Sequence, residues 1–348
     1  MRRHLFVALA AAVLGCGFVS ATFLALRQPL SMGDYLAVWG LKARAIHATG
    51  ELSSVFRVDP AGAFSHPEYP PLWPLLLAGT ARLLGRYDEL LLALLRPILL
   101  ALAAGLTFAR TRAPLPWRLL AAASLTLLPY FQTAAYTGYA EALLLVLVLA
   151  ALFLLESRSP TPLTPVVTGL LLAQAALTKQ EGVVVLLVAV GLLAAARRLR
   201  VAAIVGGLGL GLGVLPWSVF RAAHGVSGLA DFAPGSFDPA KVLRALSTLR
   251  DLAFLPAVPW LLGAAVLLAL SPGVRRERGP LLAGAAAYAA LLLASFAFAR
   301  VDVAWLVTWT WDRLALLPLA ALLPALFEAA AEPFETGSEP EGSAPAAP

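Results

Sequence analysis

Charged residues are scarce in this chain, and their scarcity excludes a soluble protein. Only 13% of the 348 residues are Asp, Glu, Lys or Arg, whereas a soluble domain carries about 25%. Hydrophobic residues make up 60% of the sequence, and the mean hydropathy is +0.82. A soluble core could not bury so much apolar surface. The composition therefore predicts an all-α protein that crosses a membrane several times.

Cysteine is almost absent as well. Cys16 is the single cysteine, so an intrachain disulfide is excluded. Residues 13–16 loosely resemble a lipoprotein processing site, but Leu14 is bulky for that role and the apolar run continues to Leu26. The run 5–26 is also longer than the apolar region of a signal peptide, which has about 7–15 residues. We therefore expect a membrane span here that is neither lipidated nor cleaved.

Long apolar runs are what the sequence does have. We expect about ten spans, with a range of about nine to eleven, because a helix needs about 20 residues to cross the hydrocarbon core. The predicted spans are 5–26, 90–109, 117–133, 139–155, 163–178, 183–196, 201–221, 252–270, 280–299 and 312–327. Residues 1–331 form one transmembrane domain. Residues 332–348 are rich in Glu, Pro, Ala, Gly and Ser, which predicts a disordered tail.

Arginine supplies most of the positive charge and lies in clusters between the apolar runs. This pattern fits the positive-inside bias of membrane proteins and does not fit the basic face of a nucleic-acid-binding fold. The clusters are Arg2-Arg3, Arg110/Arg112/Arg118, Arg197/Arg198/Arg200 and Arg275/Arg276/Arg278. All four face the cytoplasm if the apolar segment 69–84 does not cross the membrane.

Segment 69–84 therefore decides the topology. It has only 16 residues and contains Pro70, Pro71 and Pro74, which suits a helix that lies in the interface. We expect this interfacial arrangement over a crossing one. It places both termini in the cytoplasm and makes residues 27–89 a large extracytoplasmic loop with interfacial helices.

Asp34 is the most informative acid of that loop. It follows the first span and precedes an amphipathic stretch, 35–47. Asp is common at the N-cap of a helix, where its carboxylate accepts backbone hydrogen bonds. A carboxylate at the membrane surface can also act as a general acid or base. The sequence leaves both interpretations open.

His66 and Glu68 lie in a proline-rich turn of the same loop, HPEYPPL. On extended backbone, residues two apart face the same side, so this pair could share a divalent metal ion. Two ligands are a weak indication of a metal site, and a rigid turn without metal is the alternative.

Further charged residues lie where a membrane protein tolerates few. Glu141 follows Tyr139 at the outer start of a span, Lys179 and Glu181 lie in the turn TKQEG, and Arg96 interrupts an apolar run. Charges at such depth are costly and tend to be functional. The alternatives are a polar surface turn for Lys179 and Glu181, and for Arg96 a side chain that reaches the membrane surface.

Together these landmarks resemble the GT-C superfamily of polyprenyl-phosphate-sugar-dependent glycosyltransferases. The likeness is to bacterial family 39, related to protein O-mannosyltransferases and aminoarabinose transferases, and it covers about residues 5–327. The matching motifs, in chain order, are Asp34 in GDYLAVWGLKARAI, the Pro-Pro motif with its acid at 66–72, Gly138-Tyr139-Ala140-Glu141, the TKQEG turn at 178–182 and Thr310-Trp311-Asp312-Arg313.

The resemblance implies a GT-C-like fold and a reaction on the extracytoplasmic face of the bacterial inner membrane. Asp34 would be the general base that activates an acceptor hydroxyl, and the hydroxyl would displace the lipid phosphate with inversion. The remaining implied substrate-binding residues are Lys179, Arg96 and Arg313 toward the phosphate, and Glu68, Tyr69, Tyr139, Glu141 and Glu181 around donor or acceptor. The implied partners are a polyprenyl-phosphate-linked sugar, an acceptor lipid, glycan or protein, and membrane lipids.

Two other classes of function compete with this one. A transporter of lipid-linked sugars should show internal repeats and acids near the bilayer midplane. The sequence shows no convincing repeat, and its acids gather at one face. A non-catalytic scaffold of the cell envelope would make Asp34 replaceable.

Overall fold

The computed structural model describes residues 2–27, 33–57, 65–127, 138–157, 159–226, 236–252 and 271–336. Every regular element among these residues is a helix, so the predicted all-α class is confirmed. The elements are α1 (Arg2–Arg27), η1 (Tyr35–Trp39), α2 (Gly40–Thr49), η2 (Leu52–Phe56), α3 (Leu72–Leu83), α4 (Glu89–Ala93), α5 (Leu95–Arg110), α6 (Leu115–Leu127), α8 (Glu141–Leu155), α9 (Thr164–Thr178), α10 (Gln180–Ala195), α11 (Leu199–Leu208), η3 (Gly209–Val214), α12 (Leu215–Ala223), α13 (Ala240–Asp251), α15 (Pro272–Ser295), η4 (Phe296–Phe298) and α16 (Val303–Thr336).

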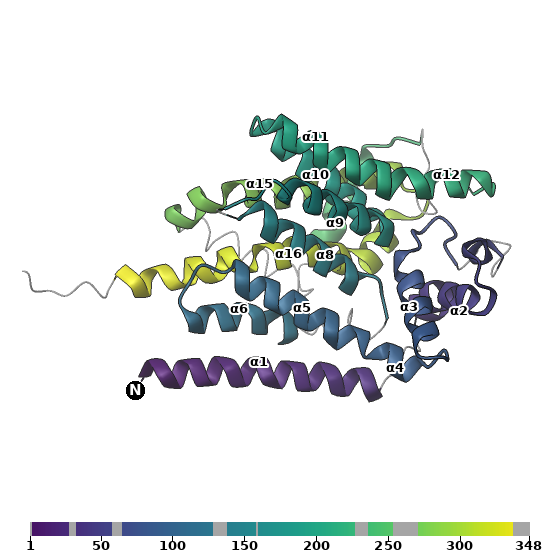
Figure 1. Ribbon diagram of the computed structural model, residues 1–348. Helices are drawn as coiled ribbons and strands as arrows, with labels where there is room; N and C mark the ends of the chain where they lie inside the picture. The colour runs from purple at the N-terminus through teal and green to yellow at the C-terminus, as the bar shows by residue number, and fades with distance from the viewer. Residues whose placement is uncertain are drawn as a thin grey trace, which may run out of the picture.

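The long helices run along a common direction, with α1 on one flank of the bundle against α6 (Figure 1). Five of the described helical stretches are long and apolar enough to cross a membrane, namely His4–Arg27, Glu89–Arg110, Leu199–Ala223, Pro272–Phe298 and Val303–Phe334. Shorter apolar helices, α6, α8, α9 and α10, pack between them. The fold is therefore a multi-pass membrane bundle.

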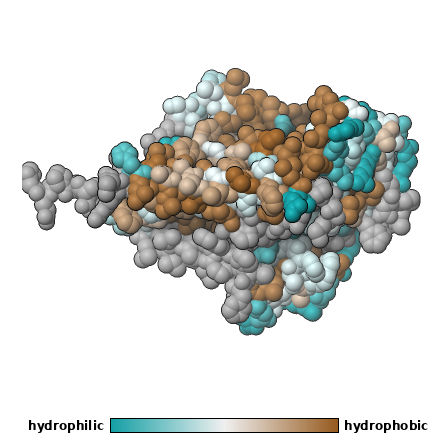
Figure 2. Space-filling model, turned by 90° about the horizontal axis from the view of Figure 1, so that it is seen from below, coloured by the Kyte–Doolittle hydropathy of each residue, from teal (hydrophilic) through white to brown (hydrophobic). Residues whose placement is uncertain are grey.

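The surface of the bundle is apolar where a membrane would contact it. On α1, large apolar side chains such as Leu5, Val19 and Phe23 are exposed, which suits contact with lipid chains and not with water. Figure 2 shows apolar side chains gathered along the length of the face seen from below. Hydrophilic side chains gather at the end of the molecule where Figure 1 places α2 and α3.

The interior is close-packed around α8. Leu144 and Leu149 of α8 are buried with Leu125 of α6 and with Leu316 and Leu323 of α16. Because α8 is apolar on all sides, it can be surrounded by other helices. Its first residue is Glu141, so the central helix of the bundle places an acid at one end of the core.

The segment predicted to be interfacial does not run along the bundle. Helix α3 has 12 residues, too few for the about 20 that a span needs. It packs against α2 and lies across the end of the bundle (Figure 1). Helices α2 and α3, together with η1 and η2, thus form a cap over one end of the bundle.

Nine of the ten predicted spans overlap described helices. Residues 128–133 of the predicted span 117–133, and residues 253–270, lie outside the described part. The last helix was predicted too short, because α16 runs from Val303 to Thr336. The predicted loop before it is helical from Val303, since the Asp302 carboxylate accepts a hydrogen bond from the Trp305 amide at 2.9 Å and caps the helix. At the other end, the helix continues five residues into the predicted tail.

Candidate functional site

Three distant segments meet in one ionic network at the capped end of the bundle. Arg313 of α16 lies with its Nη1 2.8 Å from Asp34 Oδ2. Its Nε donates a hydrogen bond to Glu141 Oε1 at 2.6 Å. The guanidinium thus joins the outer loop, the central helix and the last long helix, and it brings together three of the residues that the sequence singled out.

Lys179 extends the network to the turn between α9 and α10. Its ammonium donates to Glu141 Oε1 at 3.0 Å and to Glu181 Oε1 at 2.6 Å. Two cations therefore share one oxygen of Glu141, whose side chain is 3% exposed. Lys179 and Glu141 are buried at this short range, so their opposite charges must compensate one another, and loss of either would leave the other buried without its partner.

Asp34 is the member of the network that faces solvent. It stands at the N-terminus of the π-helical turn η1 but makes no capping hydrogen bond. The structure therefore does not support the N-cap interpretation. Its side chain is 36% exposed, more than that of Glu141, so Asp34 is the network acid that an incoming molecule can reach.

Gly33 and the residues packed around it position Asp34. Gly33 has a φ of +54°, and a Cβ there would lie 3.0 Å from the Tyr139 hydroxyl. The Tyr139 ring in turn lies under the Arg313 guanidinium, 4.3 Å from the ring centre. The carbonyl of Gly138 accepts a hydrogen bond from the indole of Trp73 on α3 at 3.0 Å. The cap over the bundle and the network are therefore one packed unit.

A cavity of about 390 Å³ opens beside the network. Lys179, Glu181 and Arg313 line it on one side, and Glu68 and Tyr69 line it on another. Its remaining walls are mostly apolar, from α10, α12, α15 and α16. A cavity of this size with a few convergent charged groups is typical of a ligand-binding site.

Sequence reasoning missed two residues of this cavity, Trp217 and Arg221 of α12. Both line it, and both donate hydrogen bonds to the Glu68 carbonyl, at 3.1 Å from Trp217 Nε1 and 3.4 Å from Arg221 Nη1. Their spacing of four residues places them on one face of a helix. In the sequence, this spacing at the end of a predicted span was the feature that could have indicated that the two residues act together.

The loop that carries Glu68 and Tyr69 is held by a buried lysine. His66 has a φ of +45°, a conformation that L side chains rarely adopt. The Lys42 ammonium donates to the His66 carbonyl at 2.6 Å, and the His66 and Tyr69 rings stack at 4.5 Å.

Burial lowers the pKa of Lys42 to about 7. For Glu68, burial opposes ionisation, but the hydrogen bond with His66 and the charge of Lys42 outweigh it and hold the pKa below its ordinary value.

The predicted metal pair lies close together. His66 Nδ1 and Glu68 Oε1 are 3.1 Å apart, which is a hydrogen bond. Within the described residues, no group of three or more His, Cys, Asp or Glu side chains could hold a metal ion. A divalent metal at this pair stays a prediction.

Arg96 does not join the other predicted residues. It is fully buried within α5, and it is not among the residues that line the cavity. Its three guanidinium nitrogens have no hydrogen-bond partner in the described part of the chain. A role of Arg96 in phosphate binding stays a prediction.

Comparison with known proteins supports the fold. No protein-family model matches the sequence, and no curated protein matches it. A solved structure does match, the crystal structure of ArnT from Cupriavidus metallidurans bound to undecaprenyl phosphate, with a TM-score of 0.59 and 18% identity. The match covers 93% of this chain and 59% of the ArnT chain. This chain therefore spans about three fifths of the length of ArnT. The helices thus have a fold like that of ArnT, which confirms the predicted multi-pass, all-α membrane fold.

Proposed function

We propose that this chain is a membrane glycosyltransferase that moves a sugar from a polyprenyl-phosphate donor to an acceptor hydroxyl. The observation that carries the proposal is the network itself. An exposed carboxylate, Asp34, pairs with Arg313, and Arg313 and Lys179 both line a ligand-sized cavity. The structural likeness to a protein that binds undecaprenyl phosphate supports a lipid phosphate as the donor.

Asp34 is the general base in this proposal. One carboxylate oxygen stays against Arg313, and the other takes the proton of the acceptor hydroxyl. The acceptor oxygen then forms a bond to the anomeric carbon, and the bond from that carbon to the phosphate oxygen breaks with inversion. The negative charge of Asp34 also stabilises the positive charge that develops on the sugar ring.

The leaving phosphate takes the electron pair and needs positive charge around it. Lys179, Arg313 and Arg221 line the cavity from three different helical segments. Arg221 is suited to the phosphate because a guanidinium can bind it with two parallel hydrogen bonds. Glu141 keeps Lys179 and Arg313 charged and oriented in the protein core.

The arginine clusters support the orientation of the protein. They lie at the end of the bundle opposite the network, and the positive-inside bias assigns that end to the cytoplasm. We therefore place the site on the extracytoplasmic face of a bacterial inner membrane, with the N- and C-terminal helix ends of α1 and α16 on the cytoplasmic side.

The test is transfer by reconstituted protein from a panel of radiolabelled polyprenyl-phosphate sugars. We expect wild type to consume one donor and Asp34→Asn to lose about 100- to 10,000-fold in rate, the usual effect of a general base. The matched control is Glu51→Gln, an exposed acid of the same outer loop that pairs with Arg57, which should keep wild-type activity. Equal turnover by wild type and Asp34→Asn would remove Asp34 from the chemistry. No turnover of any donor by correctly folded wild type would refute the transferase.

A further inference from the structure

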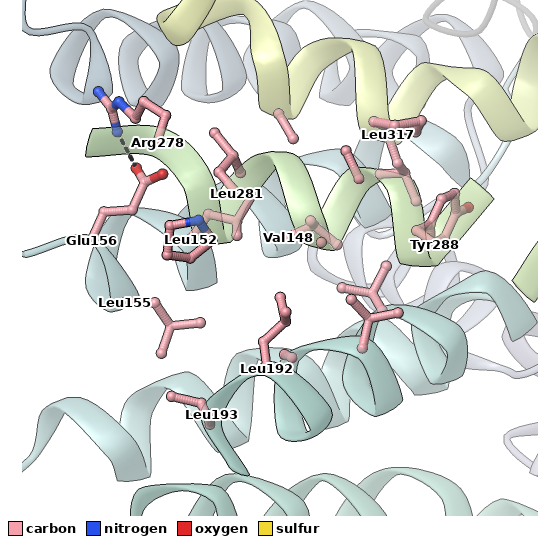
Figure 3. Close-up of a pocket in the computed structure, with 18 of the residues that line it drawn as sticks. Val148, Leu152, Leu155, Glu156, Leu192, Leu193, Arg278, Leu281, Tyr288 and Leu317 are labelled. Carbon is pink, nitrogen blue, oxygen red and sulfur yellow. Dashed lines mark ion pairs between the residues drawn. The ribbon is translucent and has the colours of Figure 1, made fainter. Parts of the chain in front are cut away.

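A second cavity, of about 380 Å³, lies in the opposite half of the bundle from the network. It is lined mainly by α8, α10, α15 and α16 and is partly open to the surface. Figure 3 shows Val148, Leu152, Leu192 and Leu317 around an open space, with Tyr288 at one end. The lining is apolar along the length of the cavity, so an apolar chain is the kind of ligand that it fits.

Charged residues lie at the other end of this cavity. Arg278 pairs with Glu156 at 3.1 Å, as the dashed line in Figure 3 marks. Arg112 pairs with Glu277 at 3.3 Å. Arg198 is an exposed cation that also lines the cavity, and no ion pair of its side chain is found among the described residues. The rim thus carries more positive than negative charge.

The backbone holds Arg198 at this rim. Arg197 has a φ of +58°, a left-handed conformation that non-glycine residues rarely adopt. The turn at Arg197 ends α10 and reverses the direction of the chain. The Arg198 amide there donates a hydrogen bond to the Leu193 carbonyl at 2.9 Å. The residue after the turn therefore stands over the cavity that Leu193 lines.

We propose that this cavity binds one acyl chain of an anionic phospholipid of the cytoplasmic leaflet, with the phosphate on Arg198. Basic pockets between membrane helices on the cytoplasmic side bind anionic headgroups, and arginine binds phosphate with paired hydrogen bonds. This site lies at the end opposite Lys179 and Arg221 and is independent of the proposed transfer reaction.

The test is native mass spectrometry of the full chain in detergent with phosphatidylglycerol, phosphatidylethanolamine or phosphatidylcholine. We expect wild type to retain phosphatidylglycerol most strongly, and Arg198→Glu to lower its retention by about fivefold or more. The matched control is Arg200→Glu, which reverses an exposed arginine of the same cluster that is not among the residues lining the cavity. It should bind as wild type does.

A second variant tests the acyl chain. Ala285→Phe fills the cavity from α15 and should reduce retention of all three phospholipids. No retention by wild type, or equal losses in Arg198→Glu and Arg200→Glu, would overturn the proposal. Retention of undecaprenyl phosphate in preference to phosphatidylglycerol, abolished by Ala285→Phe, would overturn it too and assign the cavity to a polyprenyl chain.

Discussion

Arg313 Nη1 lies 2.8 Å from Asp34 Oδ2, which joins the last long helix to the first outer loop across almost the whole sequence. The same guanidinium holds Glu141, so the exposed acid and the buried acid share one cation. Arg313 therefore fixes the position of Asp34 while Glu141 fixes the position of Arg313. Asp34 is more exposed than Glu141, so we expect their substitutions to change the stability of the protein by different amounts.

Glu141→Gln should destabilise the protein far more than Asp34→Asn. The Glu141 side chain is 3% exposed, and loss of its charge leaves Lys179 and Arg313 buried with too little negative charge. Breaking such a buried pair costs about 3–5 kcal/mol, whereas an exposed pair contributes about 1 kcal/mol or less. Denaturant unfolding in detergent micelles measures both. Equal losses in the two variants would contradict the assignment of Glu141 as the structural acid.

Arg221→Gln should weaken binding of the lipid phosphate without unfolding the protein. A hydrogen bond to a charged group contributes about 1.5–3 kcal/mol, so we expect the inhibition constant of free polyprenyl phosphate to rise about 10- to 100-fold. Arg221→Lys keeps the charge and should recover part of the affinity. Arg57→Gln, which removes an exposed arginine of the outer loop, should have no effect. An unchanged inhibition constant in Arg221→Gln would contradict phosphate binding by Arg221.

Gly182→Ala should disrupt the turn that presents Lys179 and Glu181. A Cβ at Gly182 would lie 2.1 Å from the Ala175 carbonyl oxygen. Because this oxygen belongs to the backbone, it can move only if the helix moves. We therefore expect α10 to shift away from α9. Such overpacking costs about 1–3 kcal/mol. Gly191→Ala is the control on the same helix, because nothing lies within 4 Å of its Cβ, and it should be neutral or stabilise by about 1 kcal/mol. Thermal unfolding measures both. Similar effects would contradict close packing at Gly182.

The sequence was sufficient to predict the all-α, multi-pass fold, whereas the roles of the candidate site residues stay predictions. Apolar runs of about 20 residues predict spans directly, and the prolines of 69–84 predicted that this segment does not cross. Glu141 and Lys179 were singled out because charges at such depth are costly and tend to be functional. Asp34 was singled out by its place between the first span and an amphipathic stretch, and Arg313 by the family resemblance. The network that joins them was not predictable, because no local pattern says which helix ends meet.

Two kinds of residue escaped sequence reasoning. Arg221 resembled the ordinary cation at the end of a span, and only the folded structure shows that it lines the cavity. Lys42 looked like a polar residue of an amphipathic helix, but it is 1% exposed because α2 is covered by the loop that carries Glu68. For Arg96 the sequence left a buried and a surface-reaching side chain open. The structure buries it within α5, and it does not line the cavity beside the network.

The buried Lys42 should make stability depend on pH. Its pKa is about 7 in the folded protein and about 10.4 when unfolded, so the unfolded chain binds more protons between these values. Stability should therefore rise with pH from 7 to 9, by at most about 1.4 kcal/mol per pH unit, and this slope should disappear in Lys42→Met. Unfolding at pH 7, 8 and 9 measures it. Lys241→Met, which removes another lysine-to-carbonyl hydrogen bond, controls for that loss. A parallel pH dependence in wild type and Lys42→Met would show that Lys42 keeps its proton in the folded state.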